Sequence, residues 1–477
     1  MTVGSTVAYS VGGLSDSIKT FSFTTFLLFY YTTVLGLPGT LLGLAMAIGL
    51  VWDAAVDPLI GHASDRASLR LGRRHGFMLI GAIVAGISFT AVFNPPSGLT
   101  TGWLFAWLMI SSLCLRSSSS LFMVPYYALG SELASDYHGR TSISAYRAAA
   151  VLLGTMLATA AAFNVFLPTG TGGGGDAKFD PASYASMGAA FGAAITVVGL
   201  IATLGTLKER FRLPVASPAR SNPRALKAVL LGTLRDRSFA VLFAATCLAT
   251  MASALGAALS LYFLTYHARI EANEHFTWFF AAFYGGSLVG VSIWLPVSRS
   301  VQKHHLYAGA TLITAAILST GYWLVGEGRP FGTGNLTFLI VANSLAGLFG
   351  VATSVMAPSM LADITAQDEA RTGERRDGIF FGMYSFGQQL SGGLAVLIGG
   401  MLVDRFAGLV PGQAEQSTTT VERLAVISNL LPAVILAVAG LVALRYGLTR
   451  SDIEETHFKL AQAREQSTLP AQPEIPA

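Results

Sequence analysis

The chain has 477 residues, of which 52% are hydrophobic and only 12% are charged. A soluble domain carries roughly 25% charged residues, so this composition excludes an ordinary water-soluble protein. The net charge of +4 lies in the connections between apolar segments, and no basic stripe with interleaved aromatic residues indicates nucleic-acid binding.

Apolar segments long enough to cross a membrane recur along the whole chain. A bilayer core of ~30 Å needs about 20 apolar residues in a helix, and Phe239 to Tyr266, for example, contains no charged residue. We therefore predict an all-α polytopic membrane protein with about twelve transmembrane helices in two six-helix halves. The predicted spans are 5–34, 38–62, 76–95, 102–131, 142–167, 184–207, 237–267, 275–298, 304–326, 334–360, 375–403 and 423–446.

The connections differ in their content of Lys and Arg, and this difference predicts the orientation. Basic residues concentrate after the second, sixth, eighth and tenth spans, whereas the opposite connections carry few. Because the number of spans is even, we expect both termini to be cytoplasmic in a bacterial inner membrane. The predicted domains are a six-helix half at 1–207, a cytoplasmic linker at 208–236, a second half at 237–446 and a mobile cytoplasmic tail at 447–477.

Two short segments indicate that the halves are repeats of each other. Glu132 to Thr141 reads ELASDYHGRT and Asp363 to Thr372 reads DITAQDEART. Each begins with an acid, ends with Arg-Thr at the same spacing and follows a Pro-containing helix end. Two parallel six-helix repeats are typical of one large transporter architecture.

Two acids lie within the second apolar span, in the sequence WDAAVDP. Asp53 and Asp57 are four residues apart, so both carboxylates lie on one face of a helix. In a low dielectric two close carboxylates cannot both ionise without a cation or a proton, and charges inside a membrane are usually functional. The alternative is a structural role, in which the acids pair with Lys or Arg on another helix.

Further charged residues lie inside predicted spans. Asp16 and Lys19, in the first span, have the spacing of a local ion pair. Arg116, in LCLRSSSS, could pair with an acid or bind an anionic substrate, and both interpretations remain open. Arg147, in the fifth span, offers a planar fork of donors that can hold a carboxylate or several hydroxyls, or it could neutralise Asp16 or the two acids of the second span.

Several motifs together resemble known transporters. GHASDRASLRLGRRHGF, from Gly61 to Phe77, is similar to the loop between the second and third helices of the major facilitator superfamily. FLLFYYTTVLGLPG, WDAAVDPLIGHASDR, VPYYALGSELASDYHGRTSISAYR and RTGERRDGIFFGMYSF resemble, in this order, the glycoside–pentoside–hexuronide:cation symporters, the family of the melibiose permease. The resemblance covers almost the full length and implies a monomer that binds a cation and a solute at the midplane and works by alternating access.

The resemblance also implies a role for individual residues. The matching acid pair of the family binds the coupling ion, so Asp53 and Asp57 are expected to hold Na⁺ or a proton, with Ser120 as a further oxygen ligand. Met123 stands where the family has another acid, which removes a ligand and leaves both ions possible. The resemblance implies that the loop between the second and third spans locks the cytoplasmic gate, although ordinary positive-inside charge is the alternative. The expected gate residues are Gly61, Asp65, Arg66, Arg73 and Arg74.

The expected substrate site draws on both halves. By resemblance, Asp16 (next to Ser17, which aligns with the family's acid) recognises sugar hydroxyls, Arg147 lies near the sugar and Tyr127 stacks on it. Tyr127 could equally be an ordinary packing residue. Gln389 stands where family members often have Lys, and can hydrogen-bond a polar solute but cannot organise carboxylates.

Three functions are compatible with these features. The preferred one is a Na⁺- or H⁺-coupled symporter of a sugar, glycoside or sugar acid, with membrane lipid and the small-molecule solute as its partners. The second is a symporter of a lysophospholipid or other amphiphile, because animal lysophospholipid symporters resemble this chain in the WDAxxDP and VPY…AYR patterns and because Met123 and Gln389 make the site more apolar. The third is a membrane sensor or scaffold, which the two buried acids disfavour. We expect no enzyme activity, no cofactor beyond the coupling ion and no metal site, and we interpret Cys114 and Cys247 as small buried residues.

Overall fold

The computed structural model describes residues 3–67, 71–72, 74–133, 137–170, 176–212, 236–298, 300–373, 376–411, 413 and 415–468. These residues form helices and connections, with no strand in the described ranges. Each of the twelve predicted spans coincides with one helical rod in this part of the chain.

The first half contains six long helices and two short ones. They are α1 (Val3–Phe29, continued by the π-helical turn η1, Tyr30–Val34), α2 (Gly39–Arg66), α3 (His75–Phe93), α4 (Thr101–Leu133), α5 (Tyr137–Ala161, continued by η2, Ala162–Phe166), η3 (Ala177–Phe179), α6 (Pro181–Gly205) and η4 (Leu207–Arg212). Within this half α1 packs on α5 and α6, α3 packs on α4 and α6, and α2 packs on α4.

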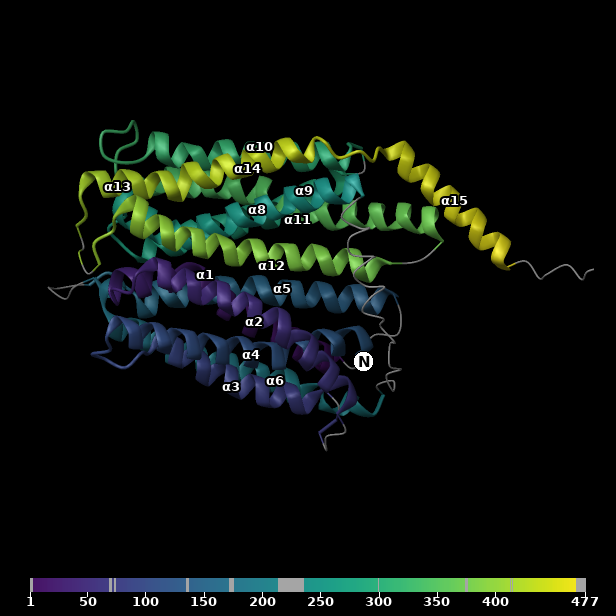
Figure 1. Cartoon of the computed structure of the whole chain (residues 1–477), viewed down its shortest axis with the longest axis horizontal. Coiled ribbons are helices and arrows are strands. Elements are labelled where there is room, and N and C mark those ends of the chain that lie inside the picture. Colours follow the sequence, from purple (N-terminus) through teal and green to yellow (C-terminus); the bar gives the residue numbers. More distant parts are fainter. Residues whose placement is uncertain are drawn as a thin grey trace, which may run out of the picture.

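The second half repeats this plan. It contains α8 (Arg237–Tyr262, continued by η5, Phe263–His267), α9 (Glu274–Val297), α10 (Lys303–Leu324), α11 (Leu336–Thr372), α12 (Asp377–Met401, continued by η6, Leu402–Ala407) and a last span built from α13 (Thr418–Ala425), η7 (Val426–Leu430) and α14 (Leu431–Ala443). The halves lie side by side, and they meet where α2 packs on α12, α1 on α8 and α5 on α9 (Figure 1).

Corresponding helices of the two halves end in the same way. The first and fifth helices, α1 and α5, finish in π-helical turns, and so do their counterparts α8 and α12. After three of these turns a backbone N–H donates to the carbonyl five residues earlier: Leu35 to Tyr30 at 3.0 Å, Leu167 to Ala162 at 2.8 Å and Ala268 to Phe263 at 2.8 Å. The two halves therefore share this geometry at corresponding helix ends.

One end of the bundle is closed by contacts between the halves. We call it the distal end, because it carries η1, η2, η5 and η6 and lies opposite the N-terminus and the C-terminal helix (Figure 1). There the Asp404 carboxylate accepts hydrogen bonds from Gly39 N at 2.8 Å, Thr40 N at 2.7 Å and Thr40 Oγ1 at 3.0 Å. We call these three bonds the Asp404 clasp. A carboxylate at a helix N-terminus is favourable because it satisfies free N–H groups and complements the helix dipole.

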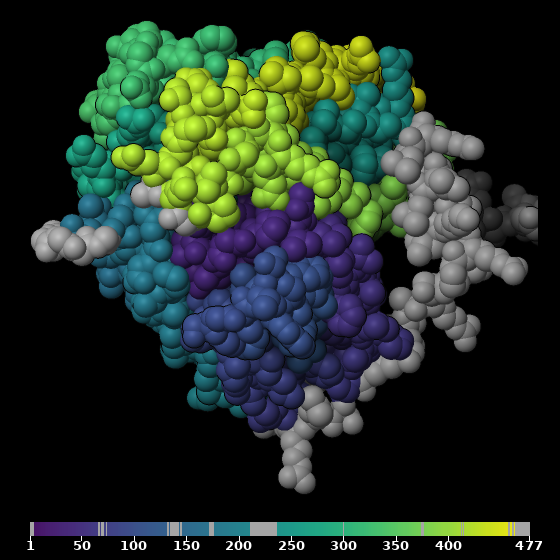
Figure 2. All heavy atoms as spheres, turned by 60° about the vertical axis from the view of Figure 1, so that its left-hand side comes forward, coloured from purple at the N-terminus to yellow at the C-terminus, as the bar shows by residue number. Residues whose placement is uncertain are grey.

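A second set of distal contacts centres on Asn273, which is fully buried. Its side-chain amide donates to Leu167 O at 3.0 Å and to Asp176 Oδ1 at 2.6 Å, and its Oδ1 accepts from Lys178 Nζ at 3.0 Å. Figure 2, in which the distal end is turned forward, shows the purple N-terminal helices in continuous contact with the yellow-green chain of the second half. Among described residues, the hydrogen bonds that join the two halves all lie near this end.

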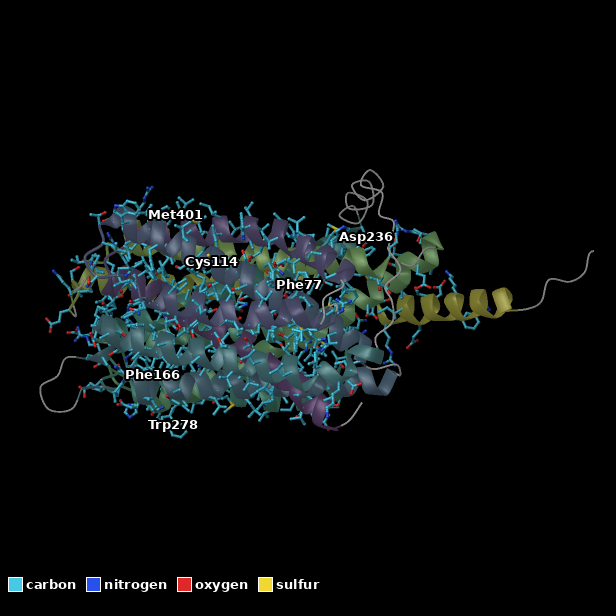
Figure 3. The ribbon with its side chains drawn as sticks, turned by 90° about the horizontal axis from the view of Figure 1, so that it is seen from below. Phe77, Cys114, Phe166, Asp236, Trp278 and Met401 are labelled. Carbon is cyan, nitrogen blue, oxygen red and sulfur yellow. The ribbon has the colours of Figure 1, made fainter. Side chains whose placement is uncertain are left out.

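The outer surface of the bundle is apolar. Large side chains such as Val51, Trp103 and Trp278 are 72%, 70% and 62% exposed, and Trp278 projects from the edge of the bundle in Figure 3. Ten of the described helical rods are long and apolar enough to cross a membrane. The other two of the twelve are α1, which carries Asp16 and Lys19, and α10, and they pack in the bundle as the rest do. Such a surface requires a lipid environment.

One expectation is wrong, and others are untested or fall outside the described ranges. Cys114 is exposed rather than buried, whereas Cys247 is partly buried. The segment predicted to be a mobile tail contains α15 (Arg450–Thr468), which packs on α11, and its mobility stays a prediction. Residues 213–235 of the predicted linker and residues 469–477 of the tail lie outside the described residues.

Candidate ion and substrate site

Among the described residues, six charged side chains lie well inside the helices of the first half. They are Asp16 and Lys19 on α1, Asp53 and Asp57 on α2, Arg116 on α4 and Arg147 on α5. Three are acids and three are bases. Charges in a membrane interior are stable only with partners or bound ions, so the geometry of each side chain indicates what it can do.

Asp53 forms an ion pair with Arg116 across the contact between α2 and α4. Gly49, one turn before Asp53, makes room for this arginine, because a Cβ atom at Gly49 would overlap its guanidinium. The neighbouring indole of Trp52 donates a hydrogen bond to Ser117 Oγ at 2.8 Å. Arg116 is therefore the partner of an acid in this structure, and a role for it in binding the substrate stays a prediction.

Asp57 differs from Asp53 because it has no cation beside it among the described residues. Its Oδ1 atom is buried and has no hydrogen-bond partner. A buried carboxylate oxygen without a partner carries a large desolvation cost, which a bound cation or a proton would remove. Asp57 is thus the one interior acid of the described chain that is left for a further ligand.

Ser120 lies at the level of Asp57. The helices α2 and α4 run in parallel, since Trp52 meets Ser117 and a Cβ atom on Gly61 would lie 3.6 Å from Val124 Cγ1. Ser120 follows Arg116 by one turn, just as Asp57 follows Asp53 by one turn. This register agrees with the expected contribution of Ser120, whose role as an ion ligand stays a prediction.

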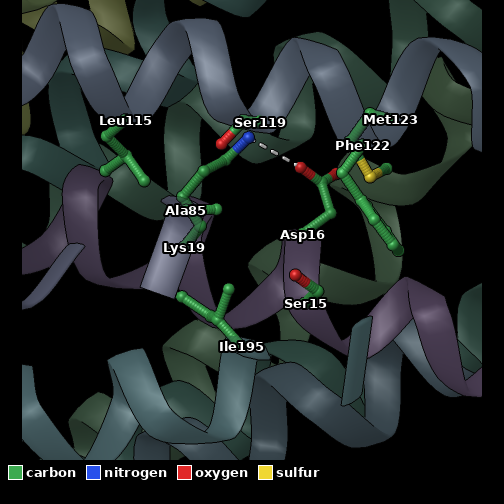
Figure 4. A pocket seen from close by; sticks show the side chains of 9 residues that line it. All are labelled: Ser15, Asp16, Lys19, Ala85, Leu115, Ser119, Phe122, Met123 and Ile195. Carbon is green, nitrogen blue, oxygen red and sulfur yellow. Dashed lines mark ion pairs between the residues drawn. The ribbon is translucent and has the colours of Figure 1, made fainter. Parts of the chain in front are cut away.

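Asp16 and Lys19 form the local ion pair that their spacing indicated, with 2.9 Å between Nζ and Oδ1. Both line a small cavity inside the first half, between α1, α3, α4 and α6 (Figure 4). The other lining residues are Ser15, Ala85, Leu115, Ser119, Phe122, Met123 and Ile195. The recognition role expected for Asp16 would therefore require the substrate to compete with Lys19.

Arg147 has an aromatic partner and no carboxylate partner among the described residues. Its guanidinium carbon lies 4.8 Å from the ring centroid of Tyr127, a cation–π distance. Gly13 on α1 allows close packing on α5 beside Arg147, because a Cβ there would lie 3.1 Å from Val151 Cγ2 and 3.3 Å from Arg147 O. Asp16 and Asp53 pair with Lys19 and Arg116 instead, so within the described chain Arg147 does not neutralise either of them.

Gln389 lies on the face of α12 that meets α2. On this antiparallel face, Gly400 lies against Gly39 and a Cβ atom on Gly393 would lie 3.1 Å from Leu50. One turn before Gly393, Gln389 reaches the level of Asp53, and its side chain is exposed. The position suits a residue that reaches the substrate from the second half, and this role stays a prediction.

The expected gate residues are only partly described. Gly61 lies within α2, and α2 ends at Arg66. The side chains of Asp65 and Arg66 and all of Arg73 lie outside the described residues, whereas Arg74 is buried at 6% exposure. The next residue, His75, contacts Thr206 Oγ1 through Nε2 at 3.1 Å. A gating function of this loop stays a prediction.

The sequence interpretation missed the contacts that close the distal end. Asp404, Asn273 and Lys178 lie at helix ends beside loops, where charged and amide residues are common and carry no distinctive spacing. They can be recognised as contact residues only from their positions in the structure, since Asp404 lies at the N-terminus of α2 and Asn273 lies beside the end of α5. These positions depend on how the two halves pack against each other.

Comparison with known proteins agrees with this architecture. The family described as MFS/sugar transport protein matches residues 8–450 of the chain. The chain belongs to this family. Because the members of this family are membrane transporters, the chain is a transporter and not an enzyme.

Several curated relatives of this MFS sugar-transport family member are named symporters, and they match it at low identity over nearly the full length. A putative glycoside/cation symporter of Escherichia coli K12 is 27% identical, with 95% of this chain and 94% of the relative covered. An uncharacterized symporter of Synechocystis is 25% identical over 97% of both chains. An inner membrane symporter of Escherichia coli K12 is 22% identical over 97% of this chain and 96% of its own.

Solved structures confirm the fold of this family member. A bacterial homologue of the human lysosomal transporter Spinster has a TM-score of 0.65 at 14% identity, covering 94% of this chain and 98% of its own. The nucleoside transporter NupG has a TM-score of 0.62 at 11% identity, with 94% of this chain and 100% of its own covered. At these identities the likeness shows the twelve-helix fold and nothing of the substrate.

Proposed function

We propose that the chain is a cation-coupled symporter of a sugar, glycoside or sugar acid, which works by alternating access between its two halves. The single observation that carries the proposal is Asp57. It is an acid in the middle of a transmembrane helix, it has a buried oxygen without a partner, and it lies one turn from the Asp53–Arg116 pair. An acid in this setting is stable when a cation binds to it or when it is protonated.

The coupling ion is Na⁺ or a proton. Na⁺ prefers several oxygen ligands, which Asp57, Ser120 and the second oxygen of Asp53 would supply. A proton needs only Asp57. Since Asp53 already pairs with Arg116, Asp57 is the residue on which coupling depends in either case.

The solute would bind between the halves near Arg147, Tyr127 and Gln389. The stack of Arg147 on Tyr127 supports this placement, because it presents donors and an aromatic face together. The closed distal end supports alternating access, since a transporter must seal one side while the other is open. The basic connections support cytoplasmic termini, and the inner membrane symporter among the relatives supports that location.

A lysolipid or similar amphiphile is the second candidate. The cavity beside Asp16 and Lys19 is too small for an acyl chain, but the apolar side chains of Leu115, Phe122, Met123 and Ile195 around it would line such a chain if they moved apart. A sphingosine-1-phosphate transporter of Xenopus tropicalis is 22% identical over 96% of the chain.

The test is uptake into proteoliposomes that contain the purified full chain. A Na⁺ gradient and a pH gradient are imposed separately, with radiolabelled methyl glucoside, glucuronate and lysophosphatidylcholine as probes. We expect one gradient to drive accumulation of a sugar-type probe, and we expect Asp57→Asn to abolish accumulation above equilibrium.

Glu327→Gln is the matched control, because Glu327 is 74% exposed in a distal loop and pairs only with Arg269 among the described residues. Accumulation that persists unchanged in Asp57→Asn would show that coupling does not depend on this acid. Uptake of the lysolipid alone would favour the second candidate.

A further inference from the structure

The six interior charges form two ion pairs and leave one charge of each sign. Asp16 pairs with Lys19 at 2.9 Å, and Asp53 pairs with Arg116. The remaining two are Asp57, whose Oδ1 has no partner, and Arg147, whose guanidinium lies over Tyr127. In the described chain these two do not form an ion pair with each other. The set is therefore neutral overall but holds two unused charges at separate places.

The two unused charges have different chemistry. Asp57 can take a cation or a proton. Arg147 cannot lose its proton in a protein, so its charge must be matched by an anion or remain unmatched. Its planar fork binds two oxygens of one carboxylate, sulfonate or phosphate group, and no carboxylate of the described residues already occupies this fork, because Asp16 and Asp53 pair with other cations.

We propose that the transported solute is a monoanion whose acidic group is held by Arg147 while Asp57 holds the coupling cation. This inference rests on the proposed function. When Na⁺ or a proton occupies Asp57, the set of six acquires one net positive charge. A net charge in a membrane interior is costly, and an anion on Arg147 removes it. An uncharged sugar would leave the charge uncompensated.

The other two cations of the set are poorer anion sites. Lys19 and Arg116 already contact carboxylates, so an anion could bind them only by displacing Asp16 or Asp53. Displacement would leave an acid without a partner in a low dielectric, which costs more than the new contact returns. Arg147 is the one interior cation of the described chain that gains a partner without another residue losing one.

The experiment compares solutes that differ only in an acidic group. Detergent-purified full chain is melted with D-glucuronate or D-glucose, with D-galacturonate or D-galactose, and with oleoyl lysophosphatidate or mono-oleoylglycerol, each with and without Na⁺ and at two pH values. A ligand that binds only the folded state raises its Tm. We expect the anionic member of at least one pair to raise the Tm, more strongly with the coupling cation, and its neutral counterpart to raise it little.

Variants test whether Arg147 holds the anion. Arg147→Gln should weaken binding of that anion by roughly tenfold or more, because a charge-assisted hydrogen bond is lost. Arg147→Lys should weaken it less, and this variant keeps the charge if the Gln variant folds poorly. Arg269→Gln is the matched control, because Arg269 lies 55% exposed in a distal loop.

The outcomes of these melts can overturn the assignment of an anionic solute to Arg147. Equal shifts from neutral and anionic members, or an anion shift that persists in Arg147→Gln, would overturn it while leaving the symporter proposal intact. No shift from any anionic member would also count against it. Gradient-driven uptake in proteoliposomes tests the symporter proposal separately, so a failure of that proposal is visible as absent uptake of every probe.

Discussion

Arg116 keeps the Asp53 carboxylate stable in the interior of the first half. The side chains are only 23% and 18% exposed, so the removal of one leaves a mostly buried charge without a partner. Loss of one member of a buried pair costs about 3–5 kcal/mol, and because both groups retain some exposure we expect roughly 1–3 kcal/mol here.

Arg116→Gln should therefore lower the Tm of the purified protein by several degrees, and Asp53→Asn in the same chain should recover most of the loss. Thermal melts of both single variants and the double variant form the measurement. A double variant less stable than either single one would contradict a simple ion pair.

For the two acids of α2, the sequence predicts the shared helix face but not the partners of the side chains. The spacing of Asp53 and Asp57 placed both on one helix face, because that follows from helical geometry within one segment. The assignment of Arg116 to Asp53, and the absence of such a partner at Asp57 in the described chain, depend on how α2 packs on α4. The register between two packed helices cannot be predicted from the sequence of either helix alone.

At the scale of elements, α2 and α12 approach closely because glycines face each other. A Cβ atom on Gly400 would overlap the backbone of Gly39, whereas one on Gly392 of the same helix would meet nothing within 4 Å. Small residues at such crossings allow backbones to pack tightly in membranes.

We expect Gly400→Ala to push the two helices apart and to lower the Tm, although Ala itself favours a helix by about 1 kcal/mol over Gly. Gly392→Ala is the matched control, and it should be neutral or slightly stabilising. Parallel melts of the two variants measure the difference. A Gly400→Ala protein as stable as Gly392→Ala would show that the contact can relax at no cost.

The start of α15 is held by a side-chain cap. Thr449 N and Oγ1 donate to Asp452 Oδ2 at 2.8 and 2.7 Å. These hydrogen bonds lower the pKa of Asp452 below its ordinary value. A lowered pKa means that the stabilisation is present at neutral pH and is lost as the pH falls through that lowered pKa.

Asp452→Ala should therefore speed amide hydrogen exchange across α15 at pH 7. The difference between variant and wild type should shrink as the pH falls through the lowered pKa of Asp452, which lies below the ordinary Asp value of about 3.9. Hydrogen exchange followed by mass spectrometry on α15 peptides measures both. A difference that is unchanged in acid would rule out the ionised carboxylate as the cause.

The helices outside the membrane explain the errors of the sequence interpretation at this scale. The spans were predicted from the length of apolar segments, so the tenth predicted span ends at residue 360, where polar residues begin. In the structure α11 continues to Thr372 and ends at Gly373, which has a φ of +72°. It also left the tail without a helix. The i,i+4 pairs Arg450–Glu454 at 2.8 Å and Lys459–Glu455 at 2.7 Å, with the cap at Thr449, were signals of α15 that the interpretation did not use.

At the scale of the whole molecule, the Asp404 clasp joins the halves at the distal end. Its three hydrogen bonds go to the first turn of α2, so the same bonds must break if the halves separate there. Asp404→Asn removes the charge and can satisfy fewer of these donors, which should raise the population that is open at the distal end.

Pulsed spin-label distances can measure this population. Labels at Val165 and Val410, both exposed near the distal end, report the separation of the halves once Cys114 and Cys247 are replaced by Ser. We expect a longer distance to gain population in Asp404→Asn. Glu415→Gln, an exposed acid of the same end, serves as control, and identical distributions in the two variants would argue against the clasp.

The number of helices could be predicted because bilayer thickness fixes span length, whereas the orientation inferred from the basic connections stays a prediction. The conformational state of the transporter, which is closed at the distal end, could not be predicted from the sequence. Closure at the distal end depends on contacts between Asn273, Lys178 and Asp404 and residues far away in the chain, and these contacts exist in only one arrangement of the halves.

The neutral sum of the interior charges has an electrical consequence. Moving one elementary charge through a membrane potential of ~100 mV involves about 2.3 kcal/mol, but Asp16, Lys19, Asp53, Asp57, Arg116 and Arg147 move as a set whose charges cancel. The return of the empty carrier should then be indifferent to voltage, and a cycle that carries one cation with one monoanion should generate no current. Such a transporter would draw its driving force from the chemical gradient of the ion alone, and it would keep working in a cell whose membrane had become depolarised.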